Sequence, residues 1–273
     1  MNKKTIKIDS ENLILTIDEP RSSFCLGGII LTPAFGVAAK RIFPLSYFLT
    51  LNGFRVFRID FRNHVGLSSG EIIDAKISTQ VEDILAAVHS LDCHFIVSLS
   101  LSVRAAIRAC ALITKPIKAV FIVPVVDVRY TLKGANGGTD LFEVYYTKPN
   151  QEGADVLGYY VKRELIKDCL EFNLDSWRDT AKDIALFKGP ASFIAGNQDP
   201  WVNFEHVKKA AQNYQKDINI ISVEAASHKI DRNPKVALTY FEYATRECLR
   251  LVGRKTDYII TPSFREIIKA ANF

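Results

Sequence analysis

Three serines alternate with apolar residues in I-V-S-L-S-L-S-V-R-A-A, residues 96–106, where an apolar run gives way to a helical pattern. Such a strand-to-helix turn can present a serine nucleophile, and its sharpness requires small residues two positions before and two positions after that serine, as in G-x-S-x-G. Ser100 meets the requirement, with Ser98 before it and Ser102 after it, whereas Ser102 is followed at the same offset by the large Arg104. The pattern therefore predicts Ser100 as a nucleophile, and the plain end of a buried strand is the alternative interpretation.

A nucleophilic serine needs a histidine to accept its proton and a carboxylate to orient that histidine. Where the serine sits on such a turn, the acid and then the histidine follow it in the chain. His228 follows an apolar run in E-A-A-S-H-K, whereas the other downstream histidine, His206, lies inside a helical pattern. Asp199 follows another apolar run in G-N-Q-D-P-W, where it could instead cap the helix that begins near residue 203. We predict a triad of Ser100, Asp199 and His228.

Two further stretches fit the same chemistry. The stretch L-T-P-A-F-G follows an apolar run near residues 28–33, at the place from which a backbone N–H group for an oxyanion hole should come. We predict the N–H groups of Phe35 and Leu101 as this pair. The stretch R-I-D-F-R-N-H-V-G-L-S-S-G, residues 58–70, keeps a spacing that is common in α/β-hydrolases. Its histidine, His64, precedes the serine, so we expect it to be structural or to line the substrate pocket.

The elements that must position these residues are short apolar runs separated by helical patterns. Runs of this kind are typical of strands buried on both faces, and their alternation with helices predicts a mostly parallel sheet with helices on both sides. The two period-two stretches before residue 19 predict an antiparallel hairpin at the edge of this sheet. The apolar runs lie at 27–32, 54–60, 94–99, 118–123, 191–196 and 218–223, and the helical patterns near 42–52, 78–91, 101–113, 203–214 and 235–251.

The alternation breaks between about 129 and 188, in a segment that has glycine-rich loops at 134–138 and 149–153 and a helical pattern at 157–170. We predict an α/β-hydrolase core of residues 1–128 and 189–273 with a helical cap of residues 129–188. The cap is dense in aromatic residues, and we expect Phe142 and Tyr160 to contact the substrate. The alternative is a helical excursion with a small core of its own.

Composition narrows the range of possible functions. The chain has 273 residues, of which 48% are hydrophobic, which is enough for one large core. The net charge is +5, but the basic residues are scattered, which argues against a nucleic-acid partner. Five widely spaced cysteines without a C-x-x-C pair predict neither a disulfide framework nor a metal site, and indicate a reducing, cytoplasmic setting. We expect no signal peptide, no membrane span and no cofactor.

Several of these stretches resemble the acyl transferase family of the bacterial luminescence fatty-acid reductase system, the myristoyl-acyl-carrier-protein thioesterases. The resemblance covers most of the chain, departs at 133–160 within the predicted cap, and replaces with Ser98 the alanine that the family has before its serine. For that reason the myristoyl specificity is not carried over. The stretches that carry the resemblance are N-G-F-R-V-F-R, N-H-V-G-L-S-S-G, S-L-S-L-S-V-R-A-A, D-C-L-E-F, N-Q-D-P-W-V, A-S-H and D-Y-I-I-T-P-S-F.

The resemblance implies an α/β-hydrolase fold and an acyl-enzyme ester on Ser100, formed from a fatty-acyl or polyketide thioester and released to water or another acceptor. It places the family's triad on Ser100, Asp199 and His228, and makes an acyl carrier protein a candidate carrier of the substrate. Two alternatives stay open. The same triad could cleave a carbon–carbon bond, an ester or a lactone, or the chain could be a non-catalytic ligand-binding protein that has kept the fold.

Overall fold

A computed structural model describes residues 2–212, 217–228, 230 and 233–271. Its centre is an eight-stranded sheet with the order β1-β2-β4-β3-β5-β6-β9-β10, in which all neighbours from β4 to β10 run parallel. The hairpin of β1 and β2 adds two antiparallel strands at one edge, as the sequence predicted. The strands are β1 (Asn2–Ile8), β2 (Glu11–Asp18), β3 (Gly28–Thr32), β4 (Arg55–Asp60), β5 (Phe95–Leu99), β6 (Lys118–Ile122), β9 (Ala191–Gly196) and β10 (Ile218–Val223).

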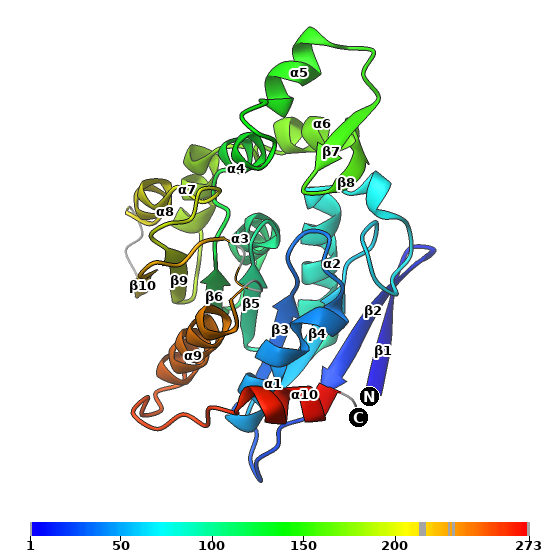
Figure 1. Cartoon of the computed structure of the whole chain (residues 1–273). Helices are drawn as coiled ribbons and strands as arrows, with labels where there is room; N and C mark the ends of the chain where they lie inside the picture. The colour runs from blue at the N-terminus through cyan, green and yellow to red at the C-terminus, as the bar shows by residue number, and fades with distance from the viewer. Residues whose placement is uncertain (1, 213–216, 229, 231–232, 272–273) are drawn as a thin grey trace.

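Helices cover both faces of this sheet (Figure 1). On one face, Ile29 and Leu31 of β3 pack with α1 (Phe43–Leu51) and α9 (Pro234–Leu251), while Ile30 packs on the opposite face. That opposite face is covered by α2 (Ile77–Ser90), α3 (Ser102–Leu112) and α8 (Phe204–Ala211). Because both faces are buried, these strands need apolar residues at every position, which explains their continuous apolar runs. A last helix, α10 (Phe264–Ala271), packs against α1 and was not predicted.

Between β6 and β9 the chain leaves the sheet. Most of this segment lies over the carboxyl ends of the strands, and its last helix packs beside α3 and α8 (Figure 1). We call this segment the insert. Its elements run from Val128 to Ala185, close to the range predicted as a cap, residues 129–188, but the division into cap and core stays a prediction. The insert contains α4 (Val128–Ala135), α5 (Leu141–Thr147), β7 (Gly153–Val156), β8 (Tyr159–Lys162), α6 (Glu164–Glu171) and α7 (Trp177–Ala185).

The predicted helix at 157–170 is wrong in its first part. Val156 of β7 pairs with Tyr159 of β8 in an antiparallel hairpin, and α6 begins only at Glu164. The two residues between the strands, Leu157 and Gly158, have φ angles of 54° and 91°. Two positive φ angles are what a two-residue hairpin turn of the mirror-image type requires, and glycine adopts one at no steric cost. Gly158 was therefore the local signal for a turn.

Buried polar contacts attach the insert to the core. Arg104 of α3 is fully buried and pairs with Asp183 of α7 at 2.7 Å. Asp168 of α6 accepts hydrogen bonds from the side chain and the backbone N–H of Ser78, at the start of α2. Both contacts hold charged groups away from water, where they are costly to leave without partners. The insert is therefore docked at a defined position against α2 and α3.

Candidate active site

Ser100 occupies a sharp turn between β5 and α3. Its φ angle is 56°, in the left-handed region, which costs a residue other than glycine about 1–2 kcal/mol. Two backbone hydrogen bonds hold the turn: the Ser100 N–H donates to the carbonyl oxygen of Ile122 at 3.0 Å, and the Val103 N–H donates to that of Ser100 at 3.0 Å. A strained serine at the carboxyl end of a central strand is the geometry that presents a nucleophile.

The structure brings the three residues of the predicted triad together. The Oγ atom of Ser100 lies 2.7 Å from Nε2 of His228, and Nδ1 of His228 lies 2.8 Å from Oδ2 of Asp199. The second carboxylate oxygen of Asp199 accepts the backbone N–H groups of Trp201 at 2.8 Å and Val202 at 3.0 Å. An ionised carboxylate only accepts hydrogen bonds, so His228 carries its proton on Nδ1, and its Nε2 is free to accept the proton of Ser100.

Ser98 and Ser102, the other two serines of the stretch, belong to a buried cluster of hydroxyl groups. Thr32 of β3 donates its hydroxyl to Ser98 at 2.6 Å, and the Ser102 hydroxyl lies 3.0 Å from both. Ser102 also donates to the carbonyl oxygen of Leu99 at 2.9 Å. All three side chains are buried, so their hydroxyls satisfy one another beneath the turn. Within the described residues, Ser100 is the only one of the three serines that contacts His228.

The predicted oxyanion donors lie at the ends of two neighbouring strands. Phe35 follows β3 and Leu101 opens α3, directly after Ser100. Among the residues that the structure describes, neither backbone N–H group has a hydrogen-bond acceptor. Two unpaired N–H groups beside a nucleophile are available to a developing negative charge, and one of them belongs to the first turn of a helix, where the helix dipole also favours an anion. Their role as an oxyanion hole stays a prediction.

His64 supports the loop that carries Phe35. Its Nε2 accepts the backbone N–H of Gly36 at 2.9 Å, and its ring packs edge-on against Phe35 with the ring centres 5.3 Å apart. Burial lowers the pKa of His64 to about 4, and an interaction with the backbone of Val65 offsets this only in part. The imidazole is therefore neutral at neutral pH. Of the two roles that the sequence predicted for His64, structural or pocket-lining, these contacts fit the structural one, and the role stays a prediction.

This lowered pKa makes stability depend on pH. In the unfolded chain His64 protonates near pH 6.5, while in the folded chain it stays neutral down to about pH 4. The contribution of His64 is fully present above pH 6.5 and is lost progressively as the pH falls toward 4, because only the unfolded state takes up the proton. We expect this group to remove about 2 kcal/mol from the free energy of unfolding between pH 7 and pH 5.

Urea denaturation at pH 7 and pH 5, in wild type and in His64→Gln, measures this loss in the free energy of unfolding. The variant should lose less stability on acidification than the wild type. His94→Gln, which changes an exposed histidine, is the matched control and should keep the wild-type dependence. Equal pH dependence in wild type and His64→Gln would show that His64 is not the buried neutral group described above.

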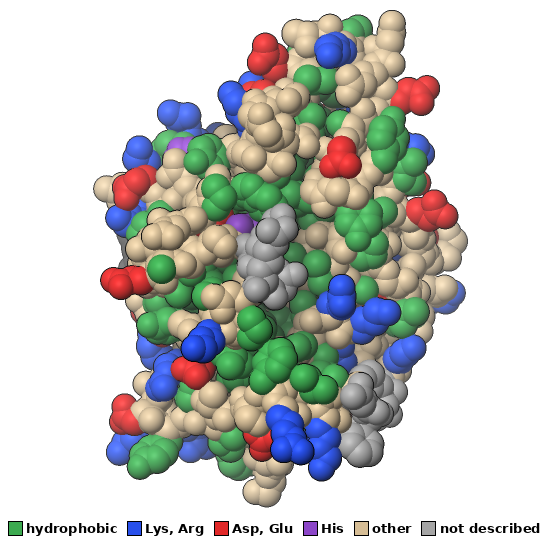
Figure 2. Space-filling view, viewed as in Figure 1, with side chains coloured by type: hydrophobic (Ala, Val, Ile, Leu, Met, Phe, Trp, Pro, Cys, Tyr) green, Lys and Arg blue, Asp and Glu red, His purple; other side chains and the backbone are tan. Residues whose placement is uncertain are grey.

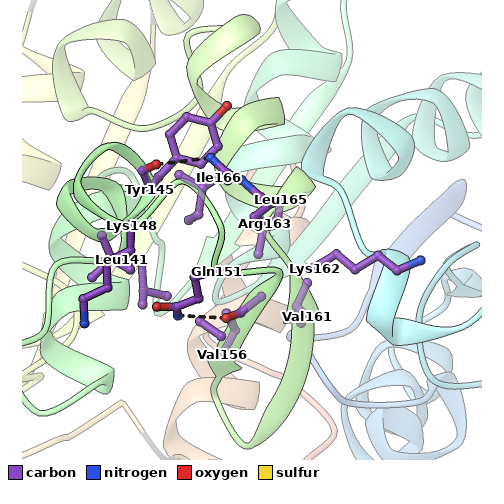
Figure 3. A pocket seen from close by; sticks show the side chains of 13 residues that line it. Leu141, Tyr145, Lys148, Gln151, Val156, Val161, Lys162, Arg163, Leu165 and Ile166 are labelled. Atoms are coloured by element: carbon purple, nitrogen blue, oxygen red, sulfur yellow. Dashed lines mark hydrogen bonds between the residues drawn. The ribbon is translucent and has the colours of Figure 1, made fainter.

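A small cavity of about 20 Å³ lies inside the insert, between α5, the β7–β8 hairpin and α6 (Figure 3). Phe142 and Tyr160 do not belong to its lining in the described chain: Phe142 is fully buried in the core cluster, and 53% of Tyr160 is exposed. Their contact with substrate stays a prediction, but neither points into this cavity. None of the triad residues lines it either. The lining is mainly apolar with a few polar groups, and includes Leu141, Val144, Tyr145, Lys148, Gln151, Ala154, Val156, Val161, Arg163, Leu165 and Ile166.

Two residues that the sequence did not single out lie at the candidate site. Trp201, two residues after Asp199, places its ring centre 5.0 Å from that of His228. Tyr159 of β8 donates its hydroxyl to the carbonyl oxygen of Gly36 at 2.9 Å. In the described residues there is no group of three or more histidine, cysteine or carboxylate side chains that could hold a metal ion. No described helix is long and apolar enough to cross a membrane.

The parallel sheet with helices on both faces, the serine turn after β5, the aspartate after β9 and the histidine after β10 define the α/β-hydrolase fold. Solved structures agree. A ferulic-acid complex of Est1E from Butyrivibrio proteoclasticus superimposes with a TM-score of 0.75 at 18% identity, over 92% of this chain and 100% of that one. A monoacylglycerol lipase from Paleococcus ferrophilus gives 0.66 at 17% identity, over 89% and 99% of the two chains. The predicted fold class is confirmed.

The chain belongs to the acyl transferase family, whose family model matches residues 5–272. It is 28% identical to an acyl transferase of Photorhabdus laumondii, over 92% of this chain and 84% of the relative. It is 30% identical to an acyl transferase of Photobacterium leiognathi, over 88% and 78% of the two chains. The predicted resemblance to this family is confirmed, and the protein is an enzyme of acyl transfer or hydrolysis.

Proposed function

We propose that this protein transfers or hydrolyses acyl groups from thioesters through an ester on Ser100. The observation that carries the proposal is the continuous contact from Ser100 through His228 to Asp199, with distances of 2.7 and 2.8 Å. Membership of the acyl transferase family supports an acyl group as the part that is transferred. Hydrophobic side chains on the face where the insert meets the core suit an apolar substrate (Figure 2).

The first half-reaction forms the acyl-enzyme. The Ser100 oxygen attacks the thioester carbonyl carbon while its proton passes to Nε2 of His228, and the carbonyl oxygen takes up the negative charge. The N–H groups of Phe35 and Leu101 are the proposed hydrogen-bond donors to that oxygen. The carbon–sulfur bond then breaks, and the thiolate leaves with the proton from His228. Asp199 stays ionised throughout and stabilises the imidazolium that forms in between.

The second half-reaction releases the acyl group. His228 removes a proton from water or from an acceptor hydroxyl, whose oxygen attacks the ester carbonyl carbon. The bond from that carbon to the Ser100 oxygen then breaks, and the Ser100 oxygen takes the proton back from His228. An acyl carrier protein is the proposed donor of the acyl group, and the insert is proposed to act as the cap over the substrate. Cleavage of a carbon–carbon bond, an ester or a lactone would use the same three residues, so the identity of the substrate has to come from experiment.

A non-catalytic role in ligand binding was the second alternative that the sequence left open, and membership of the acyl transferase family argues against it. The left-handed φ angle of Ser100 also argues against it, because backbone strain of this kind gathers at functional sites. Intact-mass measurement after incubation with a series of straight-chain acyl thioesters separates the two classes. We expect a mass gain equal to one acyl group, located by digestion on the peptide that contains Ser100. Ligand binding without any adduct or turnover would support the binding protein, and turnover of esters alone would support the other cleavage reactions.

A further inference from the structure

The peptide groups on both sides of Gly36 are held by side chains from different layers of the molecule. Its N–H group donates to Nε2 of His64, in the core, at 2.9 Å. Its carbonyl oxygen accepts the hydroxyl of Tyr159, in the insert, at 2.9 Å. Gly36 directly follows Phe35, whose N–H group is the proposed oxyanion donor. The core and the insert therefore meet at the residue next to that donor.

The two contacts at Gly36 also bear on the direction in which the Phe35 N–H group points, because both residues belong to one turn. The N–H group of Val37 donates to the carbonyl oxygen of Ala34 at 3.1 Å, which closes a turn with Phe35 and Gly36 at its centre. Gly36 has a φ angle of 73°, as the third residue of a type II turn requires. In a planar trans peptide the Phe35 N–H points opposite to the Ala34 carbonyl. Contacts that hold this turn in place therefore also fix the direction of the Phe35 N–H group.

Tyr159 leaves no room for the turn to shift toward it. A Cβ atom added to Gly36 would lie 2.2 Å from Cε2 of the Tyr159 ring, so the ring packs directly on the glycine backbone. The same ring meets that of Phe35 edge-on, with the centres 6.3 Å apart. At the start of the loop, Thr32 is held by Ser98 beneath the serine turn. The loop is thus bound at its start by the sheet and at its end by His64 and Tyr159.

We propose that Tyr159 is a positioning residue that makes stabilisation of the oxyanion depend on the docked position of the insert. Tyr159 touches no reacting atom; it acts through Gly36 on the Phe35 N–H. The insert holds Tyr159 in place because Asp168 and Asp183 fix it to α2 and α3. This inference rests on the proposed function, since it presumes that an oxyanion forms at Ser100.

The test is Tyr159→Phe, which keeps the ring and removes only the hydroxyl. Loss of a whole oxyanion donor lowers kcat about 10²–10³-fold, so a misdirected donor should lower kcat on acyl thioesters about 10–100-fold, with KM changed less than about twofold. Tyr146→Phe is the matched control, because it makes the same change at an exposed tyrosine of α5 in the insert and should leave both constants unchanged. Thermal unfolding of both variants checks that the fold is kept.

A second readout separates positioning from simple binding of the acyl chain. An acyl trifluoromethyl ketone adds to Ser100 and forms an oxyanion, whereas the corresponding alcohol does not. Tyr159→Phe should lower the affinity for the ketone by about the same factor as it lowers kcat, and should leave the affinity for the alcohol unchanged. Gly36→Ala, which pushes the turn from the other side of the contact, should give the same pattern.

Results that contradict the positioning role can be told apart from results that contradict the proposed function. Unchanged kcat and unchanged ketone affinity in Tyr159→Phe would overturn the positioning role. An equal loss of affinity for the ketone and for the alcohol would also overturn it, because Tyr159 would then be a residue that binds the acyl chain. A wild-type protein that neither turns over thioesters nor binds the ketone shows that the proposed function itself is wrong, and the positioning role fails with it.

Discussion

Ser100→Ala is expected to abolish turnover of acyl thioesters and the covalent acyl adduct. No other hydroxyl can take its place, because the φ angle of 56° and the 2.7 Å contact with His228 belong to this residue alone among the described serines. Removing the nucleophile from a serine triad costs on the order of 10⁶ in kcat. Steady-state kinetics and intact mass of the variant measure both effects. The folded state should persist, because alanine fits a turn that needs small residues.

Ser102→Ala and Ser98→Ala are the matched controls, since each removes the same hydroxyl two positions away. Both should keep most of the activity. Each also removes at least two hydrogen bonds of the buried Thr32 cluster, so the free energy of unfolding should fall by about 1–3 kcal/mol. An adduct found on Ser98, Ser102 or a cysteine, or loss of activity in Ser102→Ala with Ser100→Ala still active, would contradict the assignment.

Asp199→Asn is expected to lower turnover about 10⁴-fold while the protein stays folded. The reason lies in the two oxygens of Asp199. Oδ1 accepts the backbone N–H groups of Trp201 and Val202, and only an oxygen can keep those bonds. The new amide therefore turns its NH₂ group toward Nδ1 of His228. The histidine must then carry its proton on Nε2, where it can no longer accept the proton of Ser100.

Asp127→Asn makes a matched control for this prediction. Asp127 lies 3.0 Å from Nδ1 of His206, a second aspartate–histidine contact that does not involve Ser100. The same chemical change there should leave kcat near the wild-type value. If instead Asp199→Asn is nearly as active as wild type while Asp127→Asn is inactive, the carboxylate that supports catalysis follows β6 rather than β9. Circular dichroism of both variants verifies that they are folded.

The core of the fold and the three residues of the candidate triad could be predicted from the sequence because their signals are local. Strands buried on both faces require an apolar residue at nearly every position, so β3, β5 and β9 are visible as continuous runs. The small residues around Ser100 follow from the steric demand of one sharp turn. Asp199 and His228 each follow such a run, and parallel strands bring their carboxyl ends to one edge of the sheet.

The turn at 157–158 and β8 were predicted as helix because Tyr159–Lys162 is too short to show a period, and the two positive φ angles before it depend on the fold around them. The contact of Tyr159 with Gly36 joins residues 123 positions apart, and no spacing rule connects them. The composition of residues 96–106 and the order of serine, acid and histidine thus determined the candidate chemistry. Which tyrosine of the insert reaches the oxyanion loop was decided only by docking of the insert on the sheet, because side-chain contacts between layers depend on three-dimensional packing rather than on neighbouring residues.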